Sequence, residues 1–342
     1  MNETRLREGT STLIRKLAVS SLAVPMVCSV LPAQQPPVIR LQREITLPGV
    51  EGRIDHLSAD VAGNRVFISA LENGTVEVVE LDTGQRAAQI HGLKEPQGVL
   101  YVSKNSALYV ASGGDGSVRS YDAHTLQPLK KVELGDDADN LRFDRERGQV
   151  LAGYGQGGIA ALALDLSRLA DMKLPAHPES FQVLPDGKRL FVNLPENSSV
   201  GLVDLQSRHA DAEWGHPSAG ANFPMALDDL HSRVLLACRK PPRLLVMNDQ
   251  TGAVEGSAPT VGDADDLFFD SSRGLAYVVG GEGYVDVMRI EAAGDPVSVE
   301  HLPTAPGART GLYVPEWNKL LVAAPHRDSK EARLLVFSLA DH

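Results

Sequence analysis

Residues 65–84 read RVFISALENGTVEVVELDTG. An apolar run, Val66-Phe67-Ile68, comes first, and a Glu-Asn-Gly turn follows it at residues 72–74. The segment from Thr75 to Leu81 then alternates in polarity, and Asp82-Thr83-Gly84 ends it as a second turn. Short β-branched runs bounded by Gly, Asn and Asp are typical of antiparallel strands. This stretch therefore predicts two neighbouring strands of one small sheet.

The same plan recurs along the chain at intervals of 40 to 44 residues. Each unit holds four short strand patterns, with turn residues roughly every ten positions, and helical periodicity is nearly absent. Seven such units predict an all-β fold, a seven-bladed β-propeller with four-stranded antiparallel blades. The residues that mark the second strand of each unit are Phe67, Tyr109, Leu151, Phe191, Leu235, Tyr277 and Leu321.

The last unit is one strand short. It has strand patterns at about Gly311–Val314, Lys319–Ala323 and Arg333–Phe337, but no fourth. The alternating segment Val38–Leu47 precedes the first complete unit. We expect this N-terminal strand to close the last blade, because pairing the two ends of the repeat removes an open sheet edge.

The first 33 residues differ from the repeat. Basic residues at positions 5, 7, 15 and 16 precede an apolar stretch from Leu17 to Leu31, and Leu31-Pro32-Ala33 offers a small residue for cleavage. This pattern predicts a cleaved signal peptide over residues 1–33, since the apolar stretch is shorter than the ~20 residues of a membrane span. A retained N-terminal anchor is the alternative.

Residues 34–342 are expected to form a single propeller domain outside the cytoplasm, either periplasmic or secreted. We expect a monomer with no membrane span once the leader is removed. The formal net charge is −11, and no patch of Lys and Arg stands out. A nucleic-acid partner is therefore excluded, because phosphate binding needs a basic face.

Two units show the pattern of a known repeat most clearly. Val66-Phe67-Ile68-Ser69 is followed by the Val-rich segment 75–79 and by Asp82-Thr83-Gly84, and Leu108-Tyr109-Val110-Ala111 is followed by a similar strand and turn. The chain resembles the YVTN-repeat, YncE-like bacterial β-propellers over roughly residues 38–340. The resemblance implies the propeller fold. It carries over no catalytic residue, because the motif marks structural positions and the family is functionally mixed.

The position twelve residues before each second-strand marker begins the innermost strand of its unit, which lines the central channel. Six of these seven residues are polar or charged, where the interior of a strand would be apolar. Because they occupy one structural position in seven blades, we expect them to meet around the channel. The ring positions are Asp55, Gln97, Asp139, Glu179, Phe223, Asp265 and Arg309.

The loops that join the second and third strands open on the same face as the ring positions. The two sets together predict a polar channel mouth that binds a small molecule or a peptide or protein segment. A merely solvated funnel is the alternative. The predicted ligand-binding residues are Asp55, His56, Gln97, Asp139, Asn140, Glu179, Asn222, Arg239, Lys240, Asp265, Asp266, Arg309, His326 and Arg327.

Two units carry near-copies of one acidic sequence, GDDADN at residues 135–140 and GDADD at residues 262–266. Clustered carboxylates suit Ca²⁺ or another divalent cation, although the spacing is not that of an EF-hand loop. The alternative is that these aspartates cap backbone donors in tight turns. The candidate metal ligands are Asp137, Asp139, Asp263 and Asp265.

Three functions fit this sequence. The first is a binding or scaffold protein that recognises its ligand at the channel mouth. The second is a propeller hydrolase or lyase of lactonase type using the same residues, and the third is an interaction module that works through its sides. No nucleophile elbow, zinc-protease, haem or dinucleotide motif is present, so no catalytic residue is assigned and no organic cofactor is expected.

Overall fold

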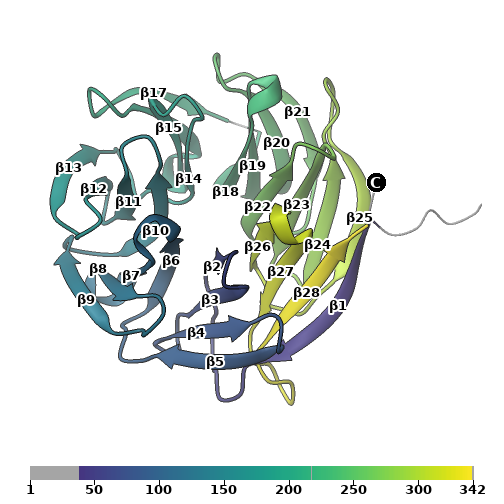
Figure 1. Cartoon of the computed structure of the whole chain (residues 1–342). Coiled ribbons are helices and arrows are strands. Elements are labelled where there is room, and N and C mark those ends of the chain that lie inside the picture. Colours follow the sequence, from purple (N-terminus) through teal and green to yellow (C-terminus); the bar gives the residue numbers. More distant parts are fainter. Residues whose placement is uncertain (1–37, 217, 341–342) are drawn as a thin grey trace, which may run out of the picture. The chain divides into compact units, whose positions relative to one another are not determined.

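The computed structural model describes residues 38–216 and 218–340. Seven four-stranded antiparallel sheets stand around a common axis, and in the first six the first strand along the chain is innermost (Figure 1). The predicted seven-bladed β-propeller is therefore confirmed. The proposed leader, residues 1–33, lies outside the described residues.

The blades follow one another in chain order, each running from its inner to its outer strand. Blade 1 consists of β2 (Leu57–Asp60), β3 (Arg65–Ala70), β4 (Thr75–Glu80) and β5 (Gln85–Ile90). Blade 2 consists of β6 (Pro96–Val102), β7 (Ala107–Ser112), β8 (Ser117–Asp122) and β9 (Pro128–Glu133). Blade 3 consists of β10 (Ala138–Asp144), β11 (Gln149–Tyr154), β12 (Gly158–Leu162) and β13 (Arg168–Lys173).

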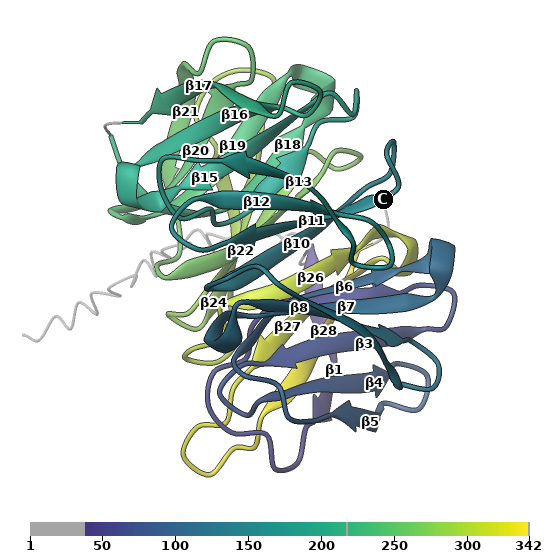
Figure 2. The same ribbon diagram turned by 90° about the vertical axis from the view of Figure 1, so that its left-hand side faces the viewer.

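The next three blades repeat this order and lie side by side in the view of Figure 2 and in Figure 1. Blade 4 consists of β14 (Phe181–Val183), β15 (Arg189–Leu194), β16 (Ser199–Asp204) and β17 (His209–Gly215). Blade 5 consists of β18 (Gly220–Asp228), β19 (Arg233–Lys240), β20 (Pro242–Asn248) and β21 (Val254–Pro259). Blade 6 consists of β22 (Ala264–Asp270), β23 (Leu275–Gly280), β24 (Tyr284–Arg289) and β25 (Val297–Pro303).

Blade 7 joins the two ends of the repeat. It consists of β26 (Thr310–Val314), β27 (Lys319–Ala324), β28 (Arg333–Leu339) and β1 (Ile39–Thr46). Strand β1 pairs antiparallel with β28 from Ile39 opposite Leu339 to Thr46 opposite Arg333, and a bulge interrupts the register after Leu41. The predicted closure by the N-terminal strand is confirmed.

Helical structure among the described residues is limited to five single turns of 3-10 helix. No helix within residues 38–216 and 218–340 has the length and hydropathy needed to cross a bilayer. The five turns are Ser103–Asn105, Gly113–Asp115, Pro195–Asn197, Asp229–His231 and Pro315–Trp317.

The hydrophobic core lies between the blades. Seven clusters of buried apolar residues fill the seven blade–blade interfaces, and each cluster takes residues from two adjacent sheets. Every second-strand marker predicted from the repeat is fully buried, and each belongs to a different cluster. The repeat period therefore follows the packing between blades, and the strand edges that face the axis are left free for polar residues.

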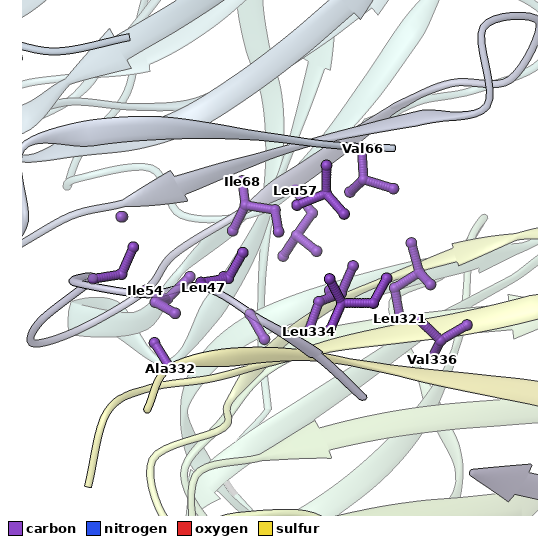
Figure 3. Packing of buried hydrophobic residues seen from close by; sticks show 14 of the residues in the cluster. Leu47, Ile54, Leu57, Val66, Ile68, Leu321, Ala332, Leu334 and Val336 are labelled. Carbon is purple, nitrogen blue, oxygen red and sulfur yellow. The ribbon is translucent and has the colours of Figure 1, made fainter. Parts of the chain in front are cut away.

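The interface between blades 7 and 1 shows how the ring is closed (Figure 3). Leu334 and Val336 of β28 and Leu47, just after β1, pack against Leu57 and Ile68 of blade 1. The amide N–H of Leu47 also donates to the carbonyl of Ala332 at 2.7 Å. The closing strand therefore contributes to the core as well as to the sheet.

Candidate functional site

A cavity of about 300 Å³ opens on the axis at one face of the propeller. It is formed where the innermost strands begin and where the loops after the second strands reach the same face. We call it the channel-mouth cavity. Its lining residues are Arg53, Asp55, His56, Gln97, Asp137, Asp139, Gln156, His177, Glu179, Pro195, Glu196, Phe223, Arg239 and Asp265.

Backbone hydrogen bonds hold the ring positions in place. The amide of Asp55 donates to the carbonyl of Ser69 at 2.7 Å, and in blade 4 the amide of Glu179 donates to the carbonyl of Asn193 at 3.0 Å. Blades 2 and 3 come close at Gly98, where a Cβ would lie 2.1 Å from the carbonyl oxygen of Asp139. The sequence therefore needs glycine beside Gln97 to let Asp139 approach the axis.

The structure brings together seven of the fourteen predicted ligand-binding residues. Three others are covered rather than exposed to the cavity: Asn140 donates to Asp139, Asn222 donates to Asn193, and Asp266 accepts the amide N–H of Gly311 at 2.8 Å. They alternate along their strands with residues that face the cavity. The seven predicted residues that line it are Asp55, His56, Gln97, Asp139, Glu179, Arg239 and Asp265.

The other four predicted residues lie elsewhere on the surface. Arg309, His326 and Arg327 line a second cavity of about 510 Å³, which shares Arg53 with the channel-mouth cavity. Lys240 lines a third, on blade 5. The Arg309 guanidinium is directed away from the axis by an ion pair with Asp263, 2.9 Å from Nη2.

Two arginines on one side of the channel-mouth cavity are engaged by carboxylates. Arg239 places Nη2 2.6 Å from Asp265 Oδ1 and stacks its guanidinium over the ring of Phe223, 3.6 Å from the ring centre. Arg53 Nη2 lies 3.3 Å from Asp55 and 3.5 Å from Asp265. Burial raises the pKa of Asp265 even so, because the Asp55 charge adds to the burial and Arg239 and Arg53 only partly offset them.

Asp139 and Glu179, on the other side, have no such partner. Neither forms an ion pair with an arginine or lysine among the described residues. Burial raises the pKa of Asp139 to about 6, against the attraction of His56, and nearby carboxylates contribute to the increase. Burial, followed by the charges of Asp139 and Asp265, raises the pKa of Glu179 well above its ordinary value. Burial therefore disfavours the ionised forms of both carboxyl groups, and a cation entering this side of the cavity would favour them.

His56 lies between the acidic groups. Its Nδ1 is 3.5 Å from Asp266 Oδ1, and its Nε2 is 4.0 Å from Asp139 Oδ1. Burial opposes protonation, but the charges of Asp266 and Asp55 outweigh it and raise the pKa of His56 to about 10. His56 is thus a cation at neutral pH, and its ion pair is with Asp266 rather than with Asp55, the preceding residue in the chain.

The four predicted metal ligands have separate environments. Asp263 and Asp265 pair with arginines, and Asp137 accepts a hydrogen bond from Gln97 at 2.9 Å. Asp137 and Asp263 both have positive φ, 37° and 55°, a conformation found in tight turns. Asp139 instead lies within 4.8 Å of donor atoms of His177 and Glu179, an arrangement able to hold a metal ion.

Two further cavity residues, Arg53 and His177, were not among the predicted ligand-binding residues. Both stand two positions before a ring position, as Asp137 does before Asp139. Residues two apart on an extended segment point to the same side. Extending the repeat register backwards by two would therefore have identified both side chains. Gln156 and Glu196 follow the second strands of blades 3 and 4, in loops where the repeat pattern does not determine the residue that turns inward.

Replacing Glu179 with Gln is expected to stabilise the protein at neutral pH. When the pKa of a carboxyl group is higher in the folded state than in the unfolded state, the protein becomes less stable as the pH increases from the unfolded pKa through the folded pKa. The uncharged amide removes this loss. The melting temperature should rise by about 2 °C or more near pH 8 and stay unchanged below about pH 3, where the carboxyl is protonated in both states.

Thermal unfolding followed by circular dichroism in a chelating buffer measures this effect. Glu196→Gln is the matched control, because Glu196 lies on the same rim but is exposed. An equal rise in both variants would show that the gain comes from the overall charge of the protein and not from the buried position of Glu179.

Comparisons with known proteins place the chain by its fold. Hydrazine synthase of Kuenenia stuttgartiensis is 15% identical, with a TM-score of 0.70 over 81% of this chain and 95% of that one. A chain of the mitotic checkpoint complex is 16% identical, with a TM-score of 0.75 over 97% and 99%. Neither the protein-family models nor the curated proteins gave a match by sequence. At these identities the likeness establishes one thing, the seven-bladed β-propeller fold.

Proposed function

We propose that the protein binds a small cationic ligand in the channel-mouth cavity. The observation that carries this proposal is the charge balance of the lining: six carboxyl groups face two arginines and the His56 cation, and all three cations are already paired with carboxylates. Asp139 and Glu179 are left without a strong counter-ion, at a cost that burial increases. A cation that enters the cavity supplies the missing charge.

The binding protein acts outside the cytoplasm in this proposal. The basic start and the apolar stretch from Leu17 to Leu31 support a secretory leader, and the YVTN-like repeats support a relation to the YncE-like propellers. A propeller fold suits recognition of a partner segment as well as of a small molecule. A segment that presents a lysine or a free amino terminus would offer the same charge to the cavity.

The test is a thermal-shift series on the purified protein with cations and anions of similar size. Diaminobutane, choline and divalent metal ions are the cationic probes, and succinate is the anionic one. At least one cation should raise the melting temperature by mass action, and succinate should not. Asp139→Asn should remove the shift, whereas Asp136→Asn, at an exposed position three residues away, should keep it. Stabilisation by succinate alone would contradict the proposal.

A hydrolase or lyase using the same cavity is the second candidate. It is favoured by Glu179, because burial raises the pKa of its carboxyl group and so favours the protonated form that a general acid needs. In that case Glu179→Gln would keep ligand binding and lose turnover of a lactone or ester substrate. A protein that binds and never turns its ligand over leaves the binding function as the whole activity.

A further inference from the structure

Three side chains from blades 3 and 4 converge on one side of the channel-mouth cavity. Asp139 stands at the start of β10, and His177 and Glu179 stand two apart in the segment before β14. One donor atom of each lies within 4.8 Å of the other two. Zinc ligands lie ~2.0–2.2 Å from the ion, so two of them in a tetrahedral site are about 3.3–3.6 Å apart, and donor atoms at the 4.8 Å limit must approach each other by up to about 1.5 Å.

The histidine of this group is oriented as metal ligands commonly are. His177 Nδ1 lies 2.5 Å from the carbonyl oxygen of Gly155. A carbonyl only accepts hydrogen bonds, so Nδ1 carries a proton, and in the neutral ring Nε2 keeps a free lone pair. A hydrogen bond from one ring nitrogen to a backbone carbonyl is the usual support for a histidine that binds a metal through the other.

Asp139 supplies an independent sign that a ligand belongs here. The side chain of Asp139 is 7% exposed, and its Oδ1 has no hydrogen-bond partner among the described residues. Its other oxygen, Oδ2, accepts a hydrogen bond from Asn140 at 3.3 Å. A buried carboxylate oxygen without a donor is costly, and a metal ion is one group that satisfies it.

We propose that Asp139, His177 and Glu179 bind a divalent transition-metal ion, and that Zn²⁺ is the ion that fits best. The imidazole nitrogen favours Zn²⁺ over Ca²⁺ and Mg²⁺, which prefer oxygen ligands alone. Three protein ligands leave one position of a tetrahedral ion open to the cavity, as in zinc sites that bind further ligands. This assignment rests on the proposed function and names the cation that the cavity takes.

Isothermal titration of the full protein, after EDTA treatment and removal of the chelator, tests the assignment. One equivalent of ZnCl₂ should bind, at least about 10-fold more tightly than CaCl₂. His177→Ala and Glu179→Gln should each weaken Zn²⁺ binding by about 100-fold or more. His326→Ala removes a histidine from the second cavity and should leave the affinity unchanged, which controls for binding at surface histidines. Circular dichroism confirms that each variant is folded.

Two results would overturn the metal assignment: an unchanged Zn²⁺ affinity in His177→Ala, or equal affinities for Zn²⁺ and Ca²⁺. If one of these results is found and diaminobutane or choline still binds in a manner that needs Asp139, the metal assignment fails while the proposed function stands. If no cation binds through Asp139, both fail. Visible absorption of the Co²⁺ form gives a second readout, because loss of the imidazole ligand in His177→Ala changes the spectrum.

Discussion

Deletion of residues 38–47 is expected to abolish cooperative folding of the propeller. The segment contains Ile39, Ile45 and Leu47, which are all almost completely buried between blades 6, 7 and 1. Losing one such side chain costs about 2–5 kcal/mol, and single domains are stable by only ~5–15 kcal/mol. The deletion also leaves β28 as an open edge that can pair with another chain. Urea unfolding should show no sharp transition, and size-exclusion chromatography should show aggregates.

Single substitutions separate the core contribution from the strand pairing. Ile45→Ala should lower the free energy of unfolding by about 3 kcal/mol. Leu41→Ala is the matched control on the same strand, because Leu41 is 49% exposed, and it should cost less than about 0.5 kcal/mol. Equal costs would mean that β1 acts only through its backbone.

Arg239→Met is expected to destabilise the protein by about 3 kcal/mol at pH 8. The substitution removes the closest counter-ion of the buried Asp265 carboxylate, 2.6 Å from Arg239 Nη2, and keeps an apolar stem against Phe223. Arg239 lowers the pKa of Asp265, so the variant raises it further. The cost is therefore complete above the folded pKa and disappears below about pH 3, where Asp265 is protonated in the folded and unfolded states.

Urea titrations at several pH values measure this dependence. Arg239→Met combined with Asp265→Asn should recover most of the lost stability, because the buried charge is gone. Arg243→Met in the same blade is the control: Arg243 donates to Ser257 Oγ at 2.7 Å, and its loss should cost about 1 kcal/mol. A cost for Arg239→Met that is independent of pH would assign its role to packing on Phe223.

The architecture could be predicted from the sequence because packing between blades repeats with the chain. Phe67 and Tyr109 recur at one spacing since each fills the interface to the next blade. The ring positions were predictable for the same reason, because each lies a fixed number of residues before the buried marker of its blade. Asp55 and Asp139 therefore lie on the axis as expected.

Side-chain direction was less predictable, because it depends on partners from other blades. Arg309 shares the ring register, but its long side chain reaches Asp263 in blade 6 and leaves the cavity. His56 was placed at the mouth, but its partner Asp266 comes from a segment 210 residues away in the chain. The ring positions could be read from the repeat, whereas the loop residues that reach the mouth and the pairs that the charges form could not.

The location of the core between the blades has an evolutionary consequence. None of the seven ring positions belongs to an interface cluster, so an exchange there changes the chemistry of the mouth without opening a void in the packing. Charged ring positions that pair across blades, such as Asp265 with Arg239, must change together with their partners. Descendants of one ancestral propeller can thus diverge in what they recognise while inheriting the same scaffold.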